Sequence, residues 1–194
     1  MEPKKNHHHG NLRNALIKAA LELLVEGGQE GLTLRKAAAR AGVSHAAPAH
    51  HFDGIDGLQR AVAAKGFQIF ARYMSDGTTK MPDDAQNQLL GITYGYLKFA
   101  SDHEALFNLI FSKPMKNSKD AELQAASMES FDILSDVCAL FEQDPAGPFV
   151  NEIKIWSVVH GYAVLRQFNR LKATPEGPAM PVELILPQLT PLKP

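Results

Sequence analysis

The stretch from Leu32 to Leu58 constrains this chain more than any other part of its sequence. Small apolar residues recur at helical spacing after Thr33, which is a suitable N-cap, and they permit a close helix crossing. Gly42 can adopt the positive backbone angle that ends such a helix, and Ser44 can cap a helix that follows. The pattern therefore predicts two short helices joined by a glycine turn, the layout of a DNA-reading helix-turn-helix.

The order of residues around this turn resembles that of the TetR family of bacterial transcriptional regulators. The likeness covers about the first third of the chain, and so long an ordered match is more specific than a single glycine motif. The residues that carry it are Arg13, Leu16, Ala19, Ala20, Leu23, Thr33, Ala38, Ala41-Gly42-Val43-Ser44, His51-Phe52 and Leu58. The resemblance implies an all-α protein, with an N-terminal three-helix DNA-binding domain and a C-terminal helical domain that binds an effector and dimerises.

Two positions depart from the family pattern. Members usually carry a tyrosine and a lysine that contact DNA phosphates where this chain has Ala49 and Ile55. Phosphate contacts set affinity and base contacts set specificity, so these losses weaken binding to all DNA sequences alike. Pro48 is also unusual, because a proline inside a helix removes a backbone hydrogen bond. The alternative to a DNA-binding regulator is therefore a helical ligand-binding dimer with weakened or lost DNA binding.

We expect the DNA-facing residues around the two short helices and in a basic arm before them. Arg35 and the Ser44 hydroxyl suit phosphate, whereas His45 and Ala46 could meet base edges. His51 could bind phosphate or merely pack beside the next residue. The full predicted set is Thr33, Arg35, Ser44, His45, Ala46, His50 and His51, together with Lys4 and Lys5.

Charge is distributed unevenly although the chain carries a formal net charge of only -1. Up to Arg72 there are ten Lys and Arg against six Asp and Glu, and the remainder has ten against fifteen. Local positive charge favours contact with nucleic acid. The single Cys138 and the lack of an apolar segment of about 20 residues favour a cytoplasmic protein without a membrane span.

Enzymatic and metal-binding functions are not expected. Cys138 and His160 could pair as nucleophile and base, but neither lies in a motif for an activated thiol. Three adjacent histidines, His7-His8-His9, cannot easily converge on one ion. The sequence therefore predicts no catalytic residues, no metal and no cofactor.

The rest of the chain has helical patterns throughout. The domains expected are a flexible arm over 1–10, a DNA-binding domain over 11–71 with its helix-turn-helix at about 33–52, and a helical effector-binding and dimerisation domain over 72–194. The body helices are expected at about 55–77, 89–100, 105–111, 120–143 and 149–170, followed by a short or kinked helix within 181–192 because prolines interrupt that segment. Two long helices of each subunit are expected to form an antiparallel dimer bundle.

The resemblance also implies a repressor that a small, mostly apolar effector releases from a double-stranded DNA operator. Trp156 to Gly161 is similar to the Trp-His-Gly signature of one TetR subgroup. Tyr94, Trp156 and His160 are favoured as effector contacts, because their polar ends need partners when buried. The candidate lining residues, each of which could equally be plain core, are Phe67, Phe70, Met74, Leu90, Tyr94, Leu97, Phe107, Phe111, Met128, Phe131, Trp156 and His160.

Overall fold

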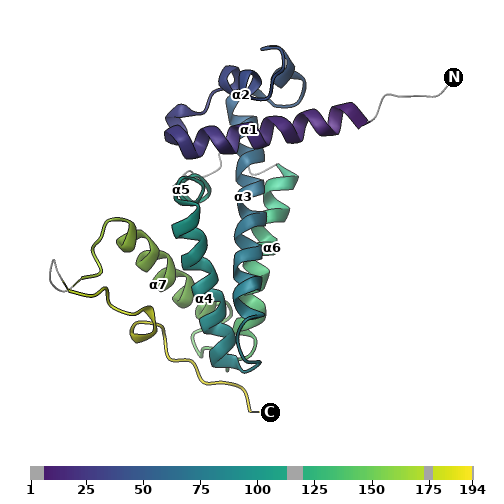
Figure 1. Cartoon of the computed structure of the whole chain (residues 1–194). Coiled ribbons are helices and arrows are strands. Elements are labelled where there is room, and N and C mark those ends of the chain that lie inside the picture. Colours follow the sequence, from purple (N-terminus) through teal and green to yellow (C-terminus); the bar gives the residue numbers. More distant parts are fainter. Residues whose placement is uncertain (1–6, 113–119, 173–176, 194) are drawn as a thin grey trace. The chain divides into compact units, whose positions relative to one another are not determined.

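The computed structural model describes residues 7–112, 120–172 and 177–193, and its long elements are all α-helices (Figure 1). No β-strand occurs in these ranges, so the predicted all-α class is confirmed. Nor is any helix within them long and apolar enough to cross a bilayer. The elements are α1 (His7–Gly31), α2 (Leu34–Arg40), η1 (Ala47–His50), α3 (Gly54–Thr78), α4 (Ala85–Asp102), α5 (Glu104–Ser112), α6 (Ala121–Cys138), α7 (Val150–Gln167) and η2 (Val182–Leu184), where η marks a single 3-10 turn.

The chain divides into two compact units. We call the first the head unit; it comprises the described residues of Met1–Phe67 and His103–Ser127. The second, the body unit, comprises those of Gln68–Asp102 and Met128–Pro194. Two helices, α3 and α6, are continuous across this division, so each contributes residues to both units.

Where α1, α2 and the start of α3 meet, the core of the head unit is built mainly from leucines and alanines. Leu16 and Leu24 of α1, Ala37 and Ala38 of α2, and Leu58 of α3 are completely buried. Alanine has no side chain beyond Cβ, so α2 can pack closely on α1. The predicted N-cap at Thr33 is confirmed, because its Oγ1 accepts a hydrogen bond from the Lys36 amide at 3.2 Å.

The prediction of a second short α-helix after the glycine turn is wrong. Gly42 does make the turn, with φ of 70°, but only the 3-10 turn η1 follows. Pro48 lies within this turn, lacks an N–H and would crowd the Ser44 carbonyl in an α-helix, which explains the tighter winding. The cap is Ala46, which makes no side-chain bond, so the predicted cap at Ser44 is also wrong.

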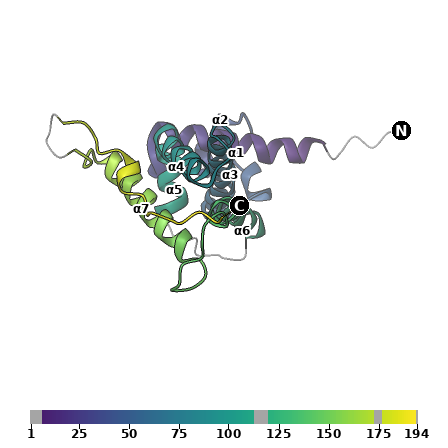
Figure 2. The same ribbon diagram turned by 90° about the horizontal axis from the view of Figure 1, so that it is seen from below.

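In the body unit, α3 and α4 lie side by side and touch at their backbones (Figures 1 and 2). A Cβ atom added to Gly95 would lie 2.2 Å from the Tyr73 carbonyl oxygen, and one added to Gly77 would lie 2.1 Å from that of Gly91. Side chains larger than hydrogen do not fit at these positions. The glycines therefore set how closely these two helices cross, and α7 packs on the same α4.

The first three predicted body helices agree with α3, α4 and α5, but the next one is shorter than expected. Helix α6 ends at Cys138 rather than near Gln143. Instead of continuing the helix, Glu142 donates its amide to the Thr190 carbonyl at 2.8 Å, and Leu192 donates to Leu140 at 2.9 Å. The C-terminal segment therefore takes hydrogen bonds that a longer α6 would have used.

The last predicted element is only a 3-10 turn. Residues 177–193 are otherwise extended or irregular, because Pro181, Pro187 and Pro191 interrupt any helix there. Helix α7 is thus the last long helix among the described residues. The expectation that each subunit brings two long helices of this kind to a bundle does not fit this C-terminal segment.

Candidate functional site

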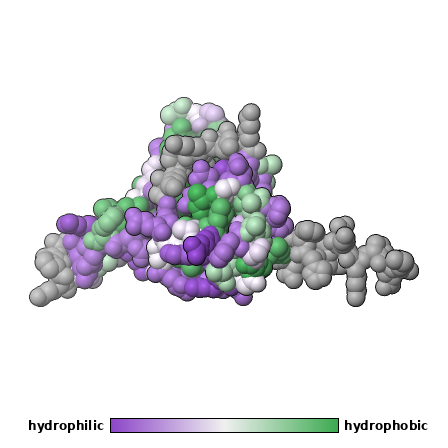
Figure 3. Space-filling model, turned by 90° about the horizontal axis from the view of Figure 1, so that it is seen from above, coloured by the Kyte–Doolittle hydropathy of each residue, from purple (hydrophilic) through white to green (hydrophobic). Residues whose placement is uncertain are grey.

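Most of the predicted DNA-facing side chains are exposed on the head unit. Thr33 and Arg35 lie before and in α2, and Ser44, His45 and Ala46 lie in the turn that leads to η1, all open to solvent. Figure 3 shows hydrophilic residues over much of one face of the molecule, with hydrophobic areas between them.

The remaining predicted DNA contacts differ in how exposed they are, and two of them lie outside the described residues. His50 is exposed at the end of η1. His51 is half-buried, and its ring centroid lies 6.4 Å from that of Phe52, so packing uses part of its surface. Lys4 and Lys5 lie outside the described residues. Helix α1 begins at His7, so residues 7–10 of the expected arm are helical.

Two cations of α2, Lys36 and Arg40, were not among the predicted DNA contacts, and they differ in their surroundings. Lys36 is exposed beside Arg35 and adds positive charge to the same short helix. Arg40 instead binds both carboxylate oxygens of Glu26, at 2.8 and 2.7 Å, and lies 3.4 Å from Glu22. The hydrogen bond from Arg40 holds the pKa of Glu26 below its ordinary value. Arg40 therefore fastens α2 to α1, and Lys36 is the additional phosphate candidate.

The structure also describes the surroundings of the two positions that depart from the family pattern. Ala49 is exposed in η1 and offers no polar atom beyond its backbone. Ile55 is half-buried at the start of α3, where its side chain can pack but cannot bind phosphate. The structure thus offers no side-chain phosphate ligand at either position.

Ion pairs join α1 and α3 to the start of α6 within the head unit. Arg13 of α1 donates to Glu122 at 2.5 Å, and its guanidinium lies 5.6 Å from the ring centroid of Phe52. Arg60 of α3 lies 3.5 Å from Asp120, whose other oxygen caps α6. The start of α6 is therefore held by charged groups of α1 and α3, and Arg13 also lies against Phe52, which follows η1.

The predicted effector contacts do not form one group. Three of them, Phe67, Phe107 and Phe111, belong to the head unit, where the Phe111 ring lies 6.0 Å from Phe67 and 5.0 Å from Phe107. The other nine belong to the body unit. Those nine are Phe70, Met74, Leu90, Tyr94, Leu97, Met128, Phe131, Trp156 and His160.

A chain of polar groups lies within the body unit where α4 packs on α7. The Tyr96 hydroxyl lies 2.8 Å from Nδ1 of His160, and the Trp156 indole also hydrogen-bonds to Tyr96. An indole N–H can only donate, so Tyr96 accepts from Trp156. The direction of the Tyr96–His160 hydrogen bond follows from which ring nitrogen of His160 carries the proton. Trp156 and His160 are four residues apart on one helix face, which explains why the two converge.

Burial keeps this cluster uncharged at neutral pH. Desolvation raises the pKa of Tyr96 far above its ordinary value, against a smaller opposing effect of the Trp156 hydrogen bond. Desolvation also lowers the pKa of His160. The cluster therefore offers neutral hydrogen-bonding groups that extend from the buried Tyr96 to Trp156, which is 37% exposed.

Aromatic rings from α3 and α4 line the same region. Phe70 lies edge-on to Tyr96 with ring centroids 4.8 Å apart, and 5.1 Å from Phe99. Across the same unit, Phe131 of α6 lies 6.1 Å from Trp156. The sequence did not indicate Tyr96 and Phe99 as effector contacts. They lie on α4 among the predicted contacts, and only packing distinguishes the faces of this helix.

Tyr94 and Met128 are less suited to line an enclosed site. The Tyr94 side chain is 41% exposed, and its hydroxyl donates to Glu183 of the C-terminal segment. Met128 is 65% exposed. Since alternate residues of a helix lie on different faces, the sequence could not tell Tyr94 from Tyr96.

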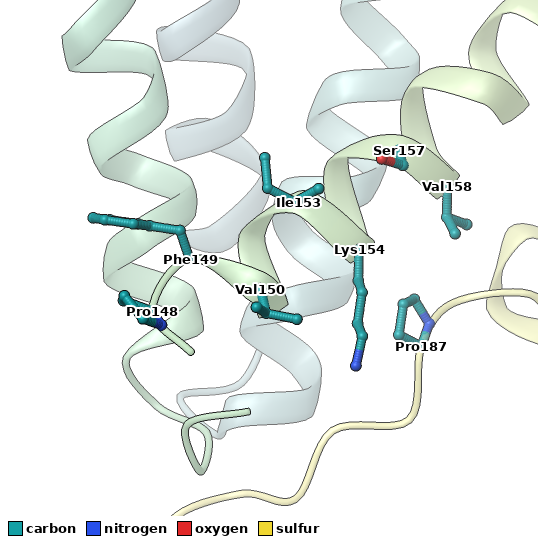
Figure 4. A pocket seen from close by; sticks show the side chains of 8 residues that line it. All are labelled: Pro148, Phe149, Val150, Ile153, Lys154, Ser157, Val158 and Pro187. Carbon is teal, nitrogen blue, oxygen red and sulfur yellow. The ribbon is translucent and has the colours of Figure 1, made fainter. Parts of the chain in front are cut away.

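Two grooves in the body unit are lined by residues outside the predicted effector set. One of about 510 Å³ lies along α7 (Figure 4), and one of about 350 Å³ lies where Ser135 and Cys138 of α6 meet the start of α7. Burial raises the pKa of the Cys138 thiol to about 12, and the charge of Glu152 adds to this effect. The thiol therefore stays protonated and is a poor nucleophile.

Two family models match this chain. The model described as bacterial regulatory proteins of the tetR family matches residues 16–62, which include α2, η1 and the start of α3. The model described as the tetracyclin repressor-like C-terminal domain matches residues 89–189. Neither match tests the Trp-His-Gly subgroup, which stays a prediction.

Individual proteins agree with these matches. An uncharacterized HTH-type transcriptional regulator of Mycobacterium tuberculosis (strain ATCC 25618 / H37Rv) is 24% identical over 154 residues, or 79% of this chain and 69% of that protein. A solved structure of a protein with unknown function from Rhodococcus sp. RHA1 is 26% identical, with a TM-score of 0.73 over 94% of this chain and 93% of the other. The multidrug binding protein EbrR, solved with imidazole, shares the fold at 18% identity and a TM-score of 0.63, over 95% and 93% of the two chains. Because the C-terminal family model alone spans more than half of the 194 residues, this chain belongs to the tetR family of bacterial regulatory proteins.

Proposed function

We propose that this regulator is a homodimeric repressor, which binds its operator through the head unit and leaves it when a small, mostly apolar effector binds the body unit. Membership of the family makes the chain a transcriptional regulator with a ligand-binding C-terminal domain, and not an enzyme. The observation that carries the proposal is the continuity of α3. This helix begins two residues after Phe52, close to the DNA-reading turn, and brings Phe70 against Tyr96.

The body unit supports an effector with an aromatic or apolar bulk and one hydrogen-bonding group. Phe70 and Phe99 supply apolar walls, while the Trp156, Tyr96 and His160 cluster supplies neutral donors and acceptors. A charged effector would lose its hydration there without gaining an opposite charge. EbrR, which shares the fold, is described as a multidrug binding protein and was solved with imidazole.

Release follows from linkage between the two sites. An effector that binds more tightly to a form of α3 with poor operator affinity shifts the protein toward that form. DNA must then weaken effector binding by the same factor. Measuring both affinities tests this reciprocity.

DNA binding is tested by an electrophoretic mobility shift with DNA that flanks the gene of this chain, at about 50 and 200 mM salt with competitor. We expect Arg35→Ala to weaken the specific shift and to reduce the slope of log affinity against log salt by about 0.9. Lys80→Ala is the matched control, since Lys80 is an exposed cation of the body unit. A slope that falls equally in both variants would contradict a specific phosphate contact by Arg35.

Effector binding can be followed by intrinsic fluorescence, because Trp156 is the only tryptophan of the chain. In a screen of small aromatic and apolar compounds, a compound that binds the cluster should change this emission and release the DNA at the same concentration. Tyr96→Phe should weaken that compound by more than Tyr94→Phe does. Release without an emission change would place the effector elsewhere.

One observation favours the alternative function, a ligand-binding dimer with weakened DNA affinity. Ala49 is exposed yet offers no phosphate ligand. Ala49→Tyr adds a phenol at this open position with little disturbance of packing. If the wild type shows no specific shift on the flanking DNA and Ala49→Tyr does, the alternative is favoured.

A further inference from the structure

The reading turn, by which we mean residues 44–52, carries no permanent charge. It contains no Lys, Arg, Asp or Glu, yet three of the eight histidines of the chain lie in these nine residues. Histidine is the side chain whose charge ordinarily changes between about pH 5 and 8. The charge that this turn presents to DNA is therefore set by the pH.

Two of the three imidazoles are open to a ligand. His45 is exposed after the glycine turn, and His50 is exposed at the end of η1. Within the described ranges, neither forms a hydrogen bond or an ion pair. His51 differs, because it is half-buried and packs beside Phe52. His45 and His50 are thus free to bind an anion when they are protonated.

The permanent cations of the helices beside the reading turn are mostly paired. Arg13 of α1, Arg40 of α2 and Arg60 of α3 each form an ion pair with a carboxylate of the head unit. Arg35 and Lys36 of α2 form none with other described residues. Two protonated imidazoles therefore double the unpaired positive charge near the reading turn.

Carboxylates also lie next to these imidazoles. Asp53 follows the reading turn directly and Asp56 belongs to the first turn of α3, and both are exposed. The Asp53 carboxylate is 3.9 Å from the Arg60 guanidinium. Acidic and basic groups thus surround the imidazoles already in the free protein, together with the neighbouring His51. A DNA phosphate adds negative charge only in the complex, so binding favours the protonated form.

We propose that His45 and His50 bind operator phosphates as imidazolium ions, so that DNA binding by the head unit takes up protons and strengthens as the pH falls. This inference rests on the DNA binding of the proposed function and adds control by pH to it. Each proton taken up on binding raises the affinity by up to about tenfold for every pH unit by which the solution is acidified. The gain is lost as the pH rises and the imidazoles become neutral.

The test is the affinity of the full chain for labelled DNA that flanks its gene, measured by fluorescence anisotropy at about pH 6 and pH 8 and at constant ionic strength. The wild type should bind at least about tenfold more tightly at the lower pH. His45→Gln with His50→Gln should bind with nearly the same affinity at both. A wild type without this gain, or a double variant that keeps it in full, overturns the proposal.

The salt dependence gives a second measurement. Each phosphate that the protein neutralises adds about 0.9 to the slope of log affinity against log salt. For the wild type this slope should be steeper at the lower pH by about 1.8 per head unit, and for the double glutamine variant it should not change. A change of shape alone would alter the affinity without releasing more ions. An equal slope at both pH values in the wild type therefore overturns the phosphate contact.

Lysine supplies a permanent charge at the same positions. His45→Lys with His50→Lys should bind at pH 8 about as tightly as the wild type binds at pH 6, with little dependence on pH. His103→Gln is the matched control, since His103 belongs to the head unit but lies between α4 and α5. If His103→Gln removes the pH dependence, the assignment to the reading turn is overturned.

Circular dichroism at both pH values shows whether each variant keeps its helices, and the exposure of His45 and His50 makes their replacement compatible with the fold. The failure of this proposal is distinct from that of the repressor function. Specific binding of the flanking DNA with equal affinity at both pH values overturns only the proton uptake. Absence of specific binding at either pH overturns both.

Discussion

The head and body units are held together by different interactions. In the head, α1, α2 and the start of α3 share a core of leucine and alanine, which is bordered by exposed ion pairs such as those between Arg40 and Glu26 and between Arg13 and Glu122. In the body, aromatic rings surround buried hydrogen bonds, as at Tyr96 and His160. The head is thus adjustable at its surface, while the body depends on tight packing around a few polar atoms.

This contrast suits a regulator. Exposed ion pairs contribute little each and rearrange easily, so the head can change its fit to DNA at low cost. Buried polar groups lose a full hydrogen bond when a partner is removed. A ligand that breaks or replaces these hydrogen bonds therefore has a large effect on the packing of the body unit. The following experiments sharpen or break this comparison.

The largest effect is expected where α3 and α4 touch. Gly95→Ala places a Cβ 2.2 Å from the Tyr73 carbonyl, and this backbone atom can move only if the helices separate. We expect a loss of about 3 kcal/mol or more in the free energy of unfolding, measured with urea. Gly31→Ala in the head, where the new Cβ would be 3.4 Å from Leu23 O, should change it by less than about 0.5 kcal/mol. Equal losses in both variants would end the contrast in packing.

The second effect concerns the polar cluster of the body. Tyr96→Phe removes the hydroxyl that hydrogen-bonds to both Trp156 and His160, so the polar atoms of these two side chains lose that partner. A loss of about 1–3 kcal/mol is expected by the same urea measurement. Tyr94→Phe, at a position that is 41% exposed, should lose less than about 0.5 kcal/mol. A smaller loss in Tyr96→Phe than in Tyr94→Phe would show that the cluster is not important for stability.

A smaller effect is expected when the pH is changed. Burial lowers the pKa of His160 from its ordinary 6.5, so in acid the unfolded chain binds this proton more readily than the folded one. Stability should therefore fall as the pH drops below about 6.5, until the folded protein is protonated as well. His160→Gln should flatten this part of the profile in thermal unfolding scans. A profile that His160→Gln leaves unchanged would assign the acid sensitivity to another group.

The smallest effect is expected in the head. The Glu26 carboxylate has a pKa below its ordinary 4.5 because of Arg40, so the pair stabilises the fold above that pH and loses its effect as the pH falls through the lowered value. Both groups are exposed, and salt screens them. Glu26→Gln should differ from wild type only slightly in low salt near neutral pH, and not at all in high salt. A large change that survives high salt would show that the head does not depend on adjustable surface pairs.

Local chemistry made much of the fold predictable. Thr33 caps α2 and Gly42 makes the turn because each property belongs to the residue itself and its near neighbours. The all-α class and the family followed from apolar spacing and from residues in order around the turn. Pro48 is also unusual in the sequence, and in the structure it lies in a 3-10 turn where a second helix was expected.

The end of α6 and the site itself needed contacts between residues far apart in sequence. Helix α6 stops at Cys138 because the C-terminal segment hydrogen-bonds to the residues beyond it. Tyr96, rather than Tyr94, is the buried tyrosine because α7 packs on its side of α4. Both outcomes depend on which distant surface lies against a helix.

The sequence by itself determined the helical class, the glycine turn and the family, because helix periods, caps and turn residues act over a few neighbouring positions. Only the tertiary structure decided which residues of α4 and α7 meet in the polar cluster, which carboxylates pair with Arg40 and which side of α7 stays uncovered. The physical reason is that amphipathic patterns specify that a face is apolar, whereas the choice of partner depends on the packing of the whole chain.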